Sequence, residues 1–230
     1  CSFTHAASNG SAIHCRPVHS REVYLQKIVQ LQQHILRGDC YEINYCQEFV
    51  AENVRLQPVD LYRQLSQLSP NPFACFYKQH AAVLACASPE RFLRRVKDQL
   101  LSQPIKGTAV RYKNDSEADD AEREKLRHNE KDKRENVMVV DLVRNDLAKI
   151  CQEGSVKVEE LFGIYTYPQV HQMISSVVGK VRTGISVAEI LRATFPMGSM
   201  TGAPKRRVLE LIEQYEMTAR GLFSGSVGYI

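Results

Sequence analysis

A short stretch bracketed by proline and glycine, residues 104–108 (PIKGT), constrains the fold of this chain more than any other. It follows a strand-like run, 99–103, and precedes a long charged segment. Proline fixes the backbone φ angle, and glycine permits a tight turn or the close approach of a ligand. We therefore expect the strand to end here, in a tight loop from which Lys106 points outward. A lysine in such a loop is most often a solvated surface charge.

A second proline-bracketed turn supplies a candidate partner for Lys106. Glu90 lies in residues 88–92 (SPERF), after another strand-like run. An acid beside an amine is a common arrangement of proton donor and nucleophile. We expect a meander that delivers Glu90 and Lys106 to one edge of a sheet, built from the strand-like runs 73–77, 81–87, 92–96 and 99–103.

Composition narrows the class of protein. The chain has 230 residues, of which 43% are hydrophobic and 24% charged, as in an ordinary globular protein. Its 30 basic and 26 acidic residues are too balanced to favour a nucleic-acid partner. No apolar run is long enough to cross a membrane, and the start has no signal-peptide layout. The seven cysteines show no paired metal-binding spacing, so we expect reduced thiols and a cytoplasmic location.

The ends of the chain suggest a piece of a longer protein. The sequence opens at Cys1 without a methionine and stops directly after a strand-like run. Residues 1–20 are polar and are expected to form a linker or lead-in. We expect residues 21–230 to belong to one catalytic domain that is cut before its C-terminal motifs.

Periodicity and capping residues predict the remaining elements. Apolar residues at helical spacing, with Ser20 and Ser186 as caps, predict helices over 21–36, 58–68, 135–147, 187–195 and 206–215. Alternating or apolar runs predict strands over 38–45, 154–158, 165–181 and 223–230. The charged segment 114–134 is expected to be a solvated helix face or a flexible loop.

Two carboxylates and one histidine are further candidates for a site. Asp132 and Glu135 lie three positions apart, so a helix would place both on one face, where their oxygens can hold Mg²⁺. Such a pair is also common on plain helix surfaces. His171 lies in a strand-like run, where histidine is usually a hydrogen-bonded structural residue, although it is also the side chain best suited to proton transfer near neutral pH.

The loop 196–205 (PMGSMTGAPK) precedes a predicted helix and is rich in glycine and hydroxyl groups. Free N–H groups at the start of a helix attract anions, so a carboxylate ligand is one interpretation. A plain turn is the other. The spacing differs from that of the common phosphate-binding loop.

Taken together, seven strings resemble the chorismate-binding enzymes, which include anthranilate, aminodeoxychorismate, isochorismate and salicylate synthases. They occur in family order: GDCYEIN (38–44), SPERF (88–92), PIKGT (104–108), ENVMVVDLVRNDL (135–147), VHQMISS (170–176), FPMGSMTGAPK (195–205) and SGSVGYI (224–230). The resemblance implies an α+β fold of two antiparallel β-sheets packed face to face with flanking helices. It also implies that this chain is incomplete at both ends, since relatives continue with an arginine-bearing strand, a glycine-rich loop and Mg²⁺-binding glutamates.

Within the family, PIKGT resembles the component I branch of the aminodeoxychorismate synthases. The resemblance implies that Lys106 attacks C2 of chorismate while Glu90 protonates the departing 4-hydroxyl. Ammonia, delivered by a glutamine amidotransferase partner (component II), would then give 4-amino-4-deoxychorismate for 4-aminobenzoate and folate synthesis.

The resemblance also assigns roles to other residues of this sequence. The implied third catalytic residue is His171, and Mg²⁺ is the implied cofactor, held by Glu135 and Asp132. The implied substrate-binding residues are Gly107, Thr108, Ser199, Gly202 and Phe223. Phe223 departs from the tyrosine or tryptophan that the family pattern leads us to expect.

Two alternatives remain at this point. Anthranilate synthase component I and isochorismate-type enzymes share most of the motifs, but anthranilate synthases typically carry alanine where Lys106 stands. A non-catalytic partner or binding module is the alternative from another class, and the presence of Glu90, Lys106, Glu135 and His171 together argues against it.

Overall fold

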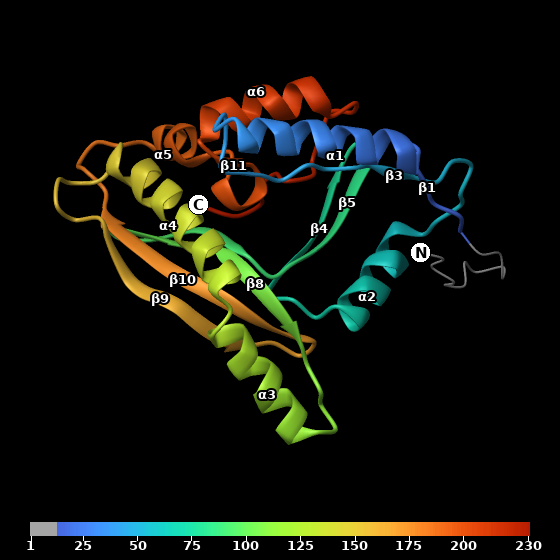
Figure 1. Ribbon diagram of the computed structural model, residues 1–230, viewed down its shortest axis with the longest axis horizontal. Coiled ribbons are helices and arrows are strands. Elements are labelled where there is room, and N and C mark those ends of the chain that lie inside the picture. Colours follow the sequence, from blue (N-terminus) through green and yellow to red (C-terminus); the bar gives the residue numbers. More distant parts are fainter. Residues whose placement is uncertain (1–12) are drawn as a thin grey trace.

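The structure, a computed structural model, describes residues 13–230 and combines helices with antiparallel strands (Figure 1). The helices are α1 (Arg21–Leu36), α2 (Pro58–Leu68), α3 (Ser116–Arg127), α4 (Glu130–Ala148), α5 (Val187–Thr194), α6 (Lys205–Tyr215) and the 3₁₀ turn η1 (Gly198–Met200). The long strands are β4 (Phe73–Gln79), β5 (Ala82–Ser88), β6 (Arg91–Val96), β7 (Gln99–Gln103), β8 (Ile105–Val110), β9 (Lys157–Thr166) and β10 (Val170–Lys180). The short ones are β1 (Arg16–Pro17), β2 (Glu42–Ile43), β3 (Phe49–Val50) and β11 (Gly202–Ala203). The expected α+β class with antiparallel sheets is confirmed.

Strand β10 is the centre of a five-stranded sheet. On one side it pairs with β9 along most of its length. On the other side its second half pairs with β7 and its first half with β8, so that β7 and β8 lie end to end along one edge of β10. The backbone N–H of Ser175 donates to the carbonyl of Pro104 at 3.2 Å, at the junction between them.

This arrangement corrects the predicted meander. The meander breaks between β5 and β6, because β4 and β5 form a hairpin of their own while β6 pairs with β7 in the large sheet. After β7 the chain continues in the same direction past Pro104, so β8 pairs with the same edge of β10. The segment that carries Lys106 is consequently a strand and not a loop. Strand β6 pairs with β7 so that Arg91 lies opposite Gln103, which still places Glu90 beside the junction.

Helices α3 and α4 cover one face of this sheet, as Figure 1 shows. The core between α4 and the sheet is apolar and almost fully buried; its members include Leu100, Val140, Leu147 and Val177. A second cluster holds α1 against α6 and consists of Leu31, Cys40, Val208 and Leu211. The two clusters account for the helical stripes in the sequence.

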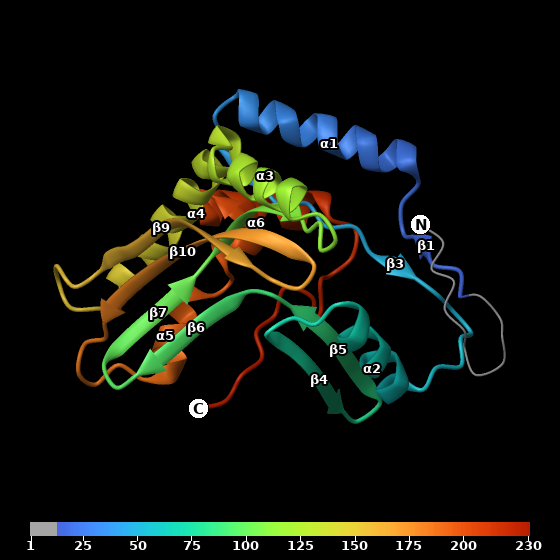
Figure 2. The ribbon, with the colours of Figure 1, turned by 90° about the horizontal axis from the view of Figure 1, so that it is seen from below.

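The hairpin of β4 and β5 forms a separate two-stranded sheet beside the large one, with α2 packed on it (Figure 2). The rings of Tyr62 in α2 and Phe76 in β4 lie 5.5 Å apart. The last residues of β5 lead directly into Glu90, so this unit positions the turn that carries the carboxylate.

Most predicted elements outside the meander are confirmed, together with their caps. Ser20 accepts a hydrogen bond from the N–H of Val23 at the start of α1, and Ser186 forms a reciprocal capping box with Glu189 at the start of α5. The charged segment folds as α3 and the first turn of α4.

Four predicted strands differ from the structure. The predicted strands 154–158 and 165–181 are the hairpin of β9 and β10, whose turn falls inside the second predicted strand. The run 38–45 contributes only Glu42–Ile43 to a strand, because its pairing partner β11 is itself two residues long. Residues 223–230 form no strand, since no segment among residues 13–222 pairs with them. Of the predicted lead-in, residues 1–12 lie outside the described part, and Arg16–Pro17 pair with Phe49–Val50. None of the helices within 13–230 is long and apolar enough to cross a membrane.

Gly202 brings two distant motifs into contact. Its φ angle is +138°, and a Cβ built on it would lie 2.1 Å from the carbonyl oxygen of Glu42. Around it, Tyr41 N–H donates to the Ala203 carbonyl and Asn44 N–H to the Thr201 carbonyl, each at 2.8 Å. A glycine is therefore required where the segments 41–44 and 201–203 meet.

We predict that Gly202→Ala destabilises the protein far more than Gly184→Ala. Gly184 also has a positive φ, +85°, but nothing lies within 4 Å of the site of its Cβ, so it reports the backbone strain alone. The control should cost about 1 kcal/mol of unfolding free energy, and Gly202→Ala about 1–3 kcal/mol more, because a backbone atom must move. Urea denaturation measures both variants. Equal losses of unfolding free energy would show that the close approach at Gly202 does not contribute to stability.

Candidate active site

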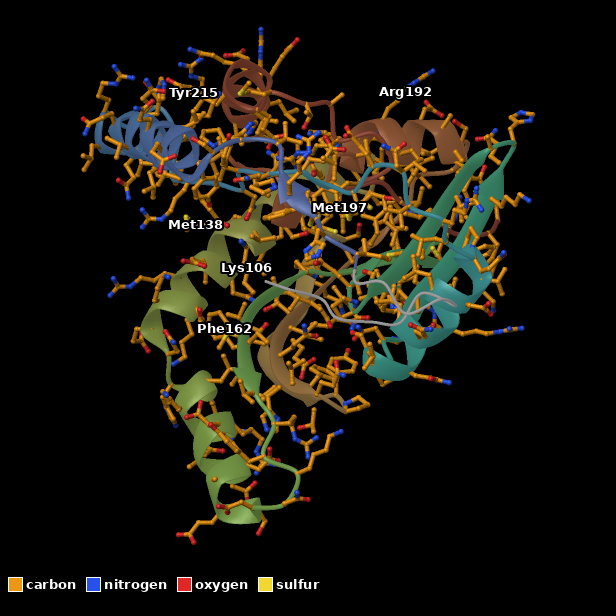
Figure 3. All side chains as sticks on the ribbon, turned by 90° about the vertical axis from the view of Figure 1, so that its right-hand side faces the viewer. Lys106, Met138, Phe162, Arg192, Met197 and Tyr215 are labelled. Atoms are coloured by element: carbon orange, nitrogen blue, oxygen red, sulfur yellow. The ribbon has the colours of Figure 1, made fainter. Side chains whose placement is uncertain are left out.

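A β-bulge in β8 sets the position of Lys106. Between two regular pairs with β10, two residues of β8, Lys106 and Gly107, lie opposite the single residue Met173. Gly107 has a φ of +96°, in the region that glycine adopts without strain. A bulge of this kind breaks the strict alternation of a strand and re-aims a side chain, which is why bulges are frequent beside active sites. Figure 3 shows Lys106 in the middle of the molecule, inside the outer layer of side chains.

The ammonium of Lys106 is paired with a buried carboxylate. Its Nζ donates to Oε1 of Glu42, which comes from β2, and the two side chains are only 15% and 13% exposed. The close contact between Gly202 and the backbone of Glu42 fixes the position of that strand. Two motifs that are 64 residues apart thus meet at one ion pair.

Glu90 lies near this pair and is held by hydrogen bonds. Ser199 Oγ donates to Glu90 Oε1 at 2.6 Å, and the backbone N–H of Ile105 also bonds to the carboxylate. Burial raises the pKa of Glu90 above its ordinary value, against the opposing effects of Ser199, Ile105 and the charge of Lys106. A carboxyl group with a raised pKa keeps its proton to higher pH, as a proton donor must.

The side chain of Asp132 packs against Gly107 of β8. A Cβ added to Gly107 would lie 3.0 Å from Cβ of Asp132 in α4, so the bulge and the helix pack directly together. Glu135 follows one turn later and forms an ion pair with Lys131, whose Nζ lies 3.6 Å from its Oε1. No group of three or more potential metal ligands occurs among residues 13–230. A pair of carboxylate oxygens is still suitable for Mg²⁺, which usually takes one or two carboxylates and completes its shell with water and substrate oxygens.

His171 belongs to a second, adjoining network. It is 1% exposed, and its Nδ1 lies 2.9 Å from Thr166 Oγ1 and its Nε2 3.2 Å from Oδ1 of Asp119. The Arg111 guanidinium, which donates to both Asp119 oxygens, is the main cause that lowers the pKa of Asp119 to about 2. An ionised carboxylate only accepts hydrogen bonds, so Nε2 of His171 carries the proton.

The structure brings most of the predicted residues together, but not all. The junction of β7 and β8 brings together Glu90, Lys106, Gly107, Ser199 and Asp132. Gly202 is linked to this group through its backbone contact with Glu42, which bonds to Lys106. His171 pairs with Ala109, three positions along β8 from Lys106. Thr108 lies on β8 with an exposed side chain.

Phe223 lies outside this group. It is 57% exposed, in the segment that follows α6. The same segment is anchored by Arg220, which bonds to Glu216 and to the carbonyl oxygens of Met200 and Asn44.

Sequence reasoning missed two charged residues, Glu42 and Asp119. Glu42 lies in the GDCYEIN string, but its neighbours gave no sign that it would face a lysine 64 positions away. Asp119 is one of several acids in a charged helix, and nothing in its local pattern separates it from the solvated ones. Both acquire their roles from tertiary pairing.

Comparisons with known proteins identify the family of the chain. The sequence profile of the family described as chorismate binding enzyme matches residues 2–230. Aminodeoxychorismate synthase component 1 of Klebsiella aerogenes is 39% identical over 211 residues, covering 92% of this chain and 46% of the relative. Aminodeoxychorismate synthase of Streptomyces griseus is 42% identical over 213 residues, covering 92% of this chain and 29% of the relative.

A solved structure shares the fold. Anthranilate synthase component I from Streptococcus pneumoniae TIGR4 superposes with a TM-score of 0.79 at 28% identity, covering 90% of this chain and 45% of that one. The chain spans less than half the length of these relatives. Because the family profile matches nearly the whole length of the chain, the chain belongs to the chorismate binding enzyme family.

Proposed function

We propose that the full-length protein is an aminodeoxychorismate synthase component I, which converts chorismate and ammonia into 4-amino-4-deoxychorismate. The observation that carries this proposal is a lysine on a bulged strand beside a glutamate of raised pKa, in a member of a chorismate-binding family. Residues 21–230 would form part of the catalytic domain. The names of the relatives from Klebsiella aerogenes and Streptomyces griseus support the choice of reaction.

The proposed chemistry proceeds in two displacements. Nζ of Lys106, as the free amine, forms a bond to C2 of chorismate while both ring double bonds shift by one position, C1=C2 to C1=C6 and C5=C6 to C4=C5, and the C4–oxygen bond breaks. Glu90 gives its proton to that oxygen, which leaves as water. Ammonia then bonds to C4, both double bonds shift back, the lysine leaves C2 as the free amine, and the new ammonium at C4 returns a proton to Glu90. The hydrogen bond between Ser199 and Glu90 supports this assignment, since it orients the proton donor.

Further residues are proposed to bind or orient the substrate. The exposed hydroxyl of Thr108, the bulge glycine Gly107 and the hydroxyl of Ser199 lie on or beside the segment that carries Lys106. Gly202 would act through the backbone of β2, and Phe223 would contact the ligand from the exposed segment after α6. His171 takes part only if a substrate group replaces Thr166 at its Nδ1.

Asp132 and Glu135 are the residues proposed to hold Mg²⁺. When bound, the ion would neutralise the ring carboxylate of chorismate. The contact between Asp132 and the Gly107 backbone supports this placement, because it ties the carboxylate to the strand of the nucleophile. Ammonia would come from a glutamine amidotransferase subunit, as the name component 1 of the relatives suggests, in a cytoplasmic complex.

We predict that Lys106→Ala abolishes amination of chorismate, by a factor on the order of 10³ or more, because it removes the amine that forms the bond to C2. Lys113→Ala is the matched control, since Lys113 is an exposed lysine just after β8. The assay supplies ammonium salt and Mg²⁺ to the full-length protein and measures 4-amino-4-deoxychorismate by chromatography.

Trapping tests the same step directly. With ammonia withheld, mass spectrometry should find a chorismate-derived adduct on the peptide that carries Lys106. Full activity of Lys106→Ala would contradict the nucleophile assignment, and formation of anthranilate or isochorismate instead would move the protein to a sister branch of the family.

We predict that Ser199→Ala moves the apparent pKa of Glu90 in the kcat/KM profile to higher pH. The Ser199 hydrogen bond favours the ionised carboxylate and so lowers the pKa of Glu90; its loss raises that pKa, and the acid keeps its proton at higher pH. Rates are compared from pH 6 to 10 at a constant concentration of unprotonated ammonia, with Ser224→Ala as control. If the apparent pKa of Glu90 stays in place or moves to lower pH, Glu90 is not the proton donor.

A further inference from the structure

The guanidinium of Arg220 is buried and forms hydrogen bonds through all five of its N–H groups. The Arg220 side chain is 15% exposed, and that of its partner Glu216 only 6%. Nε and Nη2 donate to the two carboxylate oxygens of Glu216 at 2.9 and 2.6 Å. Nη1 donates to the carbonyl of Met200 at 2.7 Å and to Ser224 Oγ at 3.3 Å, and Nη2 also donates to the carbonyl of Asn44 at 2.8 Å. Only the planar fork of an arginine can form such a set of bonds.

The carboxylate of Glu216 is itself firmly held. Glu216 follows the last residue of α6, and its N–H donates to the carbonyl of Ile212 at 2.8 Å. Its Oε1 also accepts from the N–H of Cys46 at 2.9 Å. Helix α6 is fixed in turn by Val208 and Leu211, both 0% exposed. The guanidinium therefore rests on a well-packed support.

Arg220 completes a ring of hydrogen bonds around the turn η1. Three consecutive carbonyls of this loop accept from outside it: that of Ser199 from Nδ2 of Asn44 at 3.1 Å, that of Met200 from Arg220, and that of Thr201 from the N–H of Asn44 at 2.8 Å. The carbonyl of Asn44 also accepts from Arg220. The arginine thus joins the turn 198–200 to the segment 42–44.

The position of the Ser199 hydroxyl depends on this turn. Ser199 lies in the middle of η1 and donates to Oε1 of Glu90 at 2.6 Å. A 3₁₀ turn of three residues has few internal bonds, so bonds from outside decide where its side chains point. A hydrogen bond weakens steeply when its angle is lost, so a small shift of the turn would release Glu90.

We propose that Arg220 is a positioning residue, which fixes the turn 198–200 against residues 42–44 and thereby holds the Ser199 hydroxyl where it orients Glu90. This inference rests on the proposed function, in which Glu90 is the proton donor. The hydrogen bonds of Arg220 go to Glu216, to Ser224 and to two backbone carbonyls, so it acts on the reaction through Ser199 and not by direct contact.

The variant Arg220→Lys tests this in the full-length protein. Lysine keeps a positive charge beside Glu216, so no buried charge is left without a partner, but it lacks the fork that spans two carbonyls. Arg207→Lys is the matched control, because Arg207 belongs to α6, is 40% exposed and pairs with Glu210. If Arg220→Lys does not fold, Glu216→Gln keeps the arginine, removes the charge of its support and should give the same pattern with smaller changes.

Hydrogen exchange followed by mass spectrometry measures the hold on the segment without using catalysis. Residues 41–46 supply N–H donors to the carbonyls of Ala203 and Thr201 and to the carboxylate of Glu216. We expect this segment to exchange about tenfold faster or more in Arg220→Lys, because bonds to a charged group are lost there. Exchange of residues 171–179 in β10, and of both segments in Arg207→Lys, should not change.

Kinetics then show whether the loosened turn affects the reaction. Loss of chorismate is followed at saturating ammonium salt and Mg²⁺. We expect kcat to fall about tenfold in Arg220→Lys and in Ser199→Ala, with KM changing less than about threefold, because a misplaced proton donor slows the chemical step more than binding. If the arginine acts through Ser199, the double variant should stay within about threefold of the slower single variant.

Unchanged exchange of residues 41–46 in folded Arg220→Lys overturns the proposal. So do an unchanged kcat and losses that multiply in the double variant, since either would mean that Arg220 does not act through Ser199. If exchange and kcat change as expected but Lys106→Ala still aminates chorismate, Arg220 keeps its role and the nucleophile of the proposed function is rejected. If Lys106→Ala is inactive and Arg220→Lys behaves as wild type, the function stands and the role of Arg220 is rejected.

Discussion

The burial of strand β10 is the constraint on which the rest of the structure depends. Residues 171–179 are all buried, so every neighbour of this strand must supply either a hydrogen-bonded edge or an apolar face. Strand β9 takes one edge, β7 and β8 share the other, and α4 covers a face. The division of one edge between two strands creates the junction at Pro104. The candidate site lies where that edge is interrupted.

Three of the carboxylates in the site and in the adjoining His171 network have different properties because their surroundings differ. Glu90 is buried with few donors, which raises its pKa, whereas Asp119 faces a guanidinium, which lowers its pKa to about 2. Glu42 faces an amine. Surroundings that give neighbouring carboxylates different pKa values allow them to take different roles in one reaction.

Local sequence signals predicted the helices well and the sheet poorly. Caps such as Ser186 and the apolar stripe of α4 act within a few residues, so their outcome is visible in the sequence. The pairing of β8 with β10 joins segments at least 60 positions apart, and no local signal in the sequence predicts it. Glu90 and Lys106 lie in turn motifs that are visible in the sequence, so both could be predicted as candidates. Glu42 reaches the site through the short pairing of β2 with β11, which no local pattern predicts.

The contact between Gly202 and Glu42 has a consequence for how the protein folds. It closes a loop of about 160 residues, and the bond between Ser199 and Glu90 closes one of 109. Contacts between such distant segments cost chain entropy before they return any stabilisation, so they form late. The helices and the β4–β5 hairpin can assemble from neighbouring residues, but the lysine and its carboxylates meet only when the chain is nearly native. Chemical competence is thus acquired in the last steps of folding.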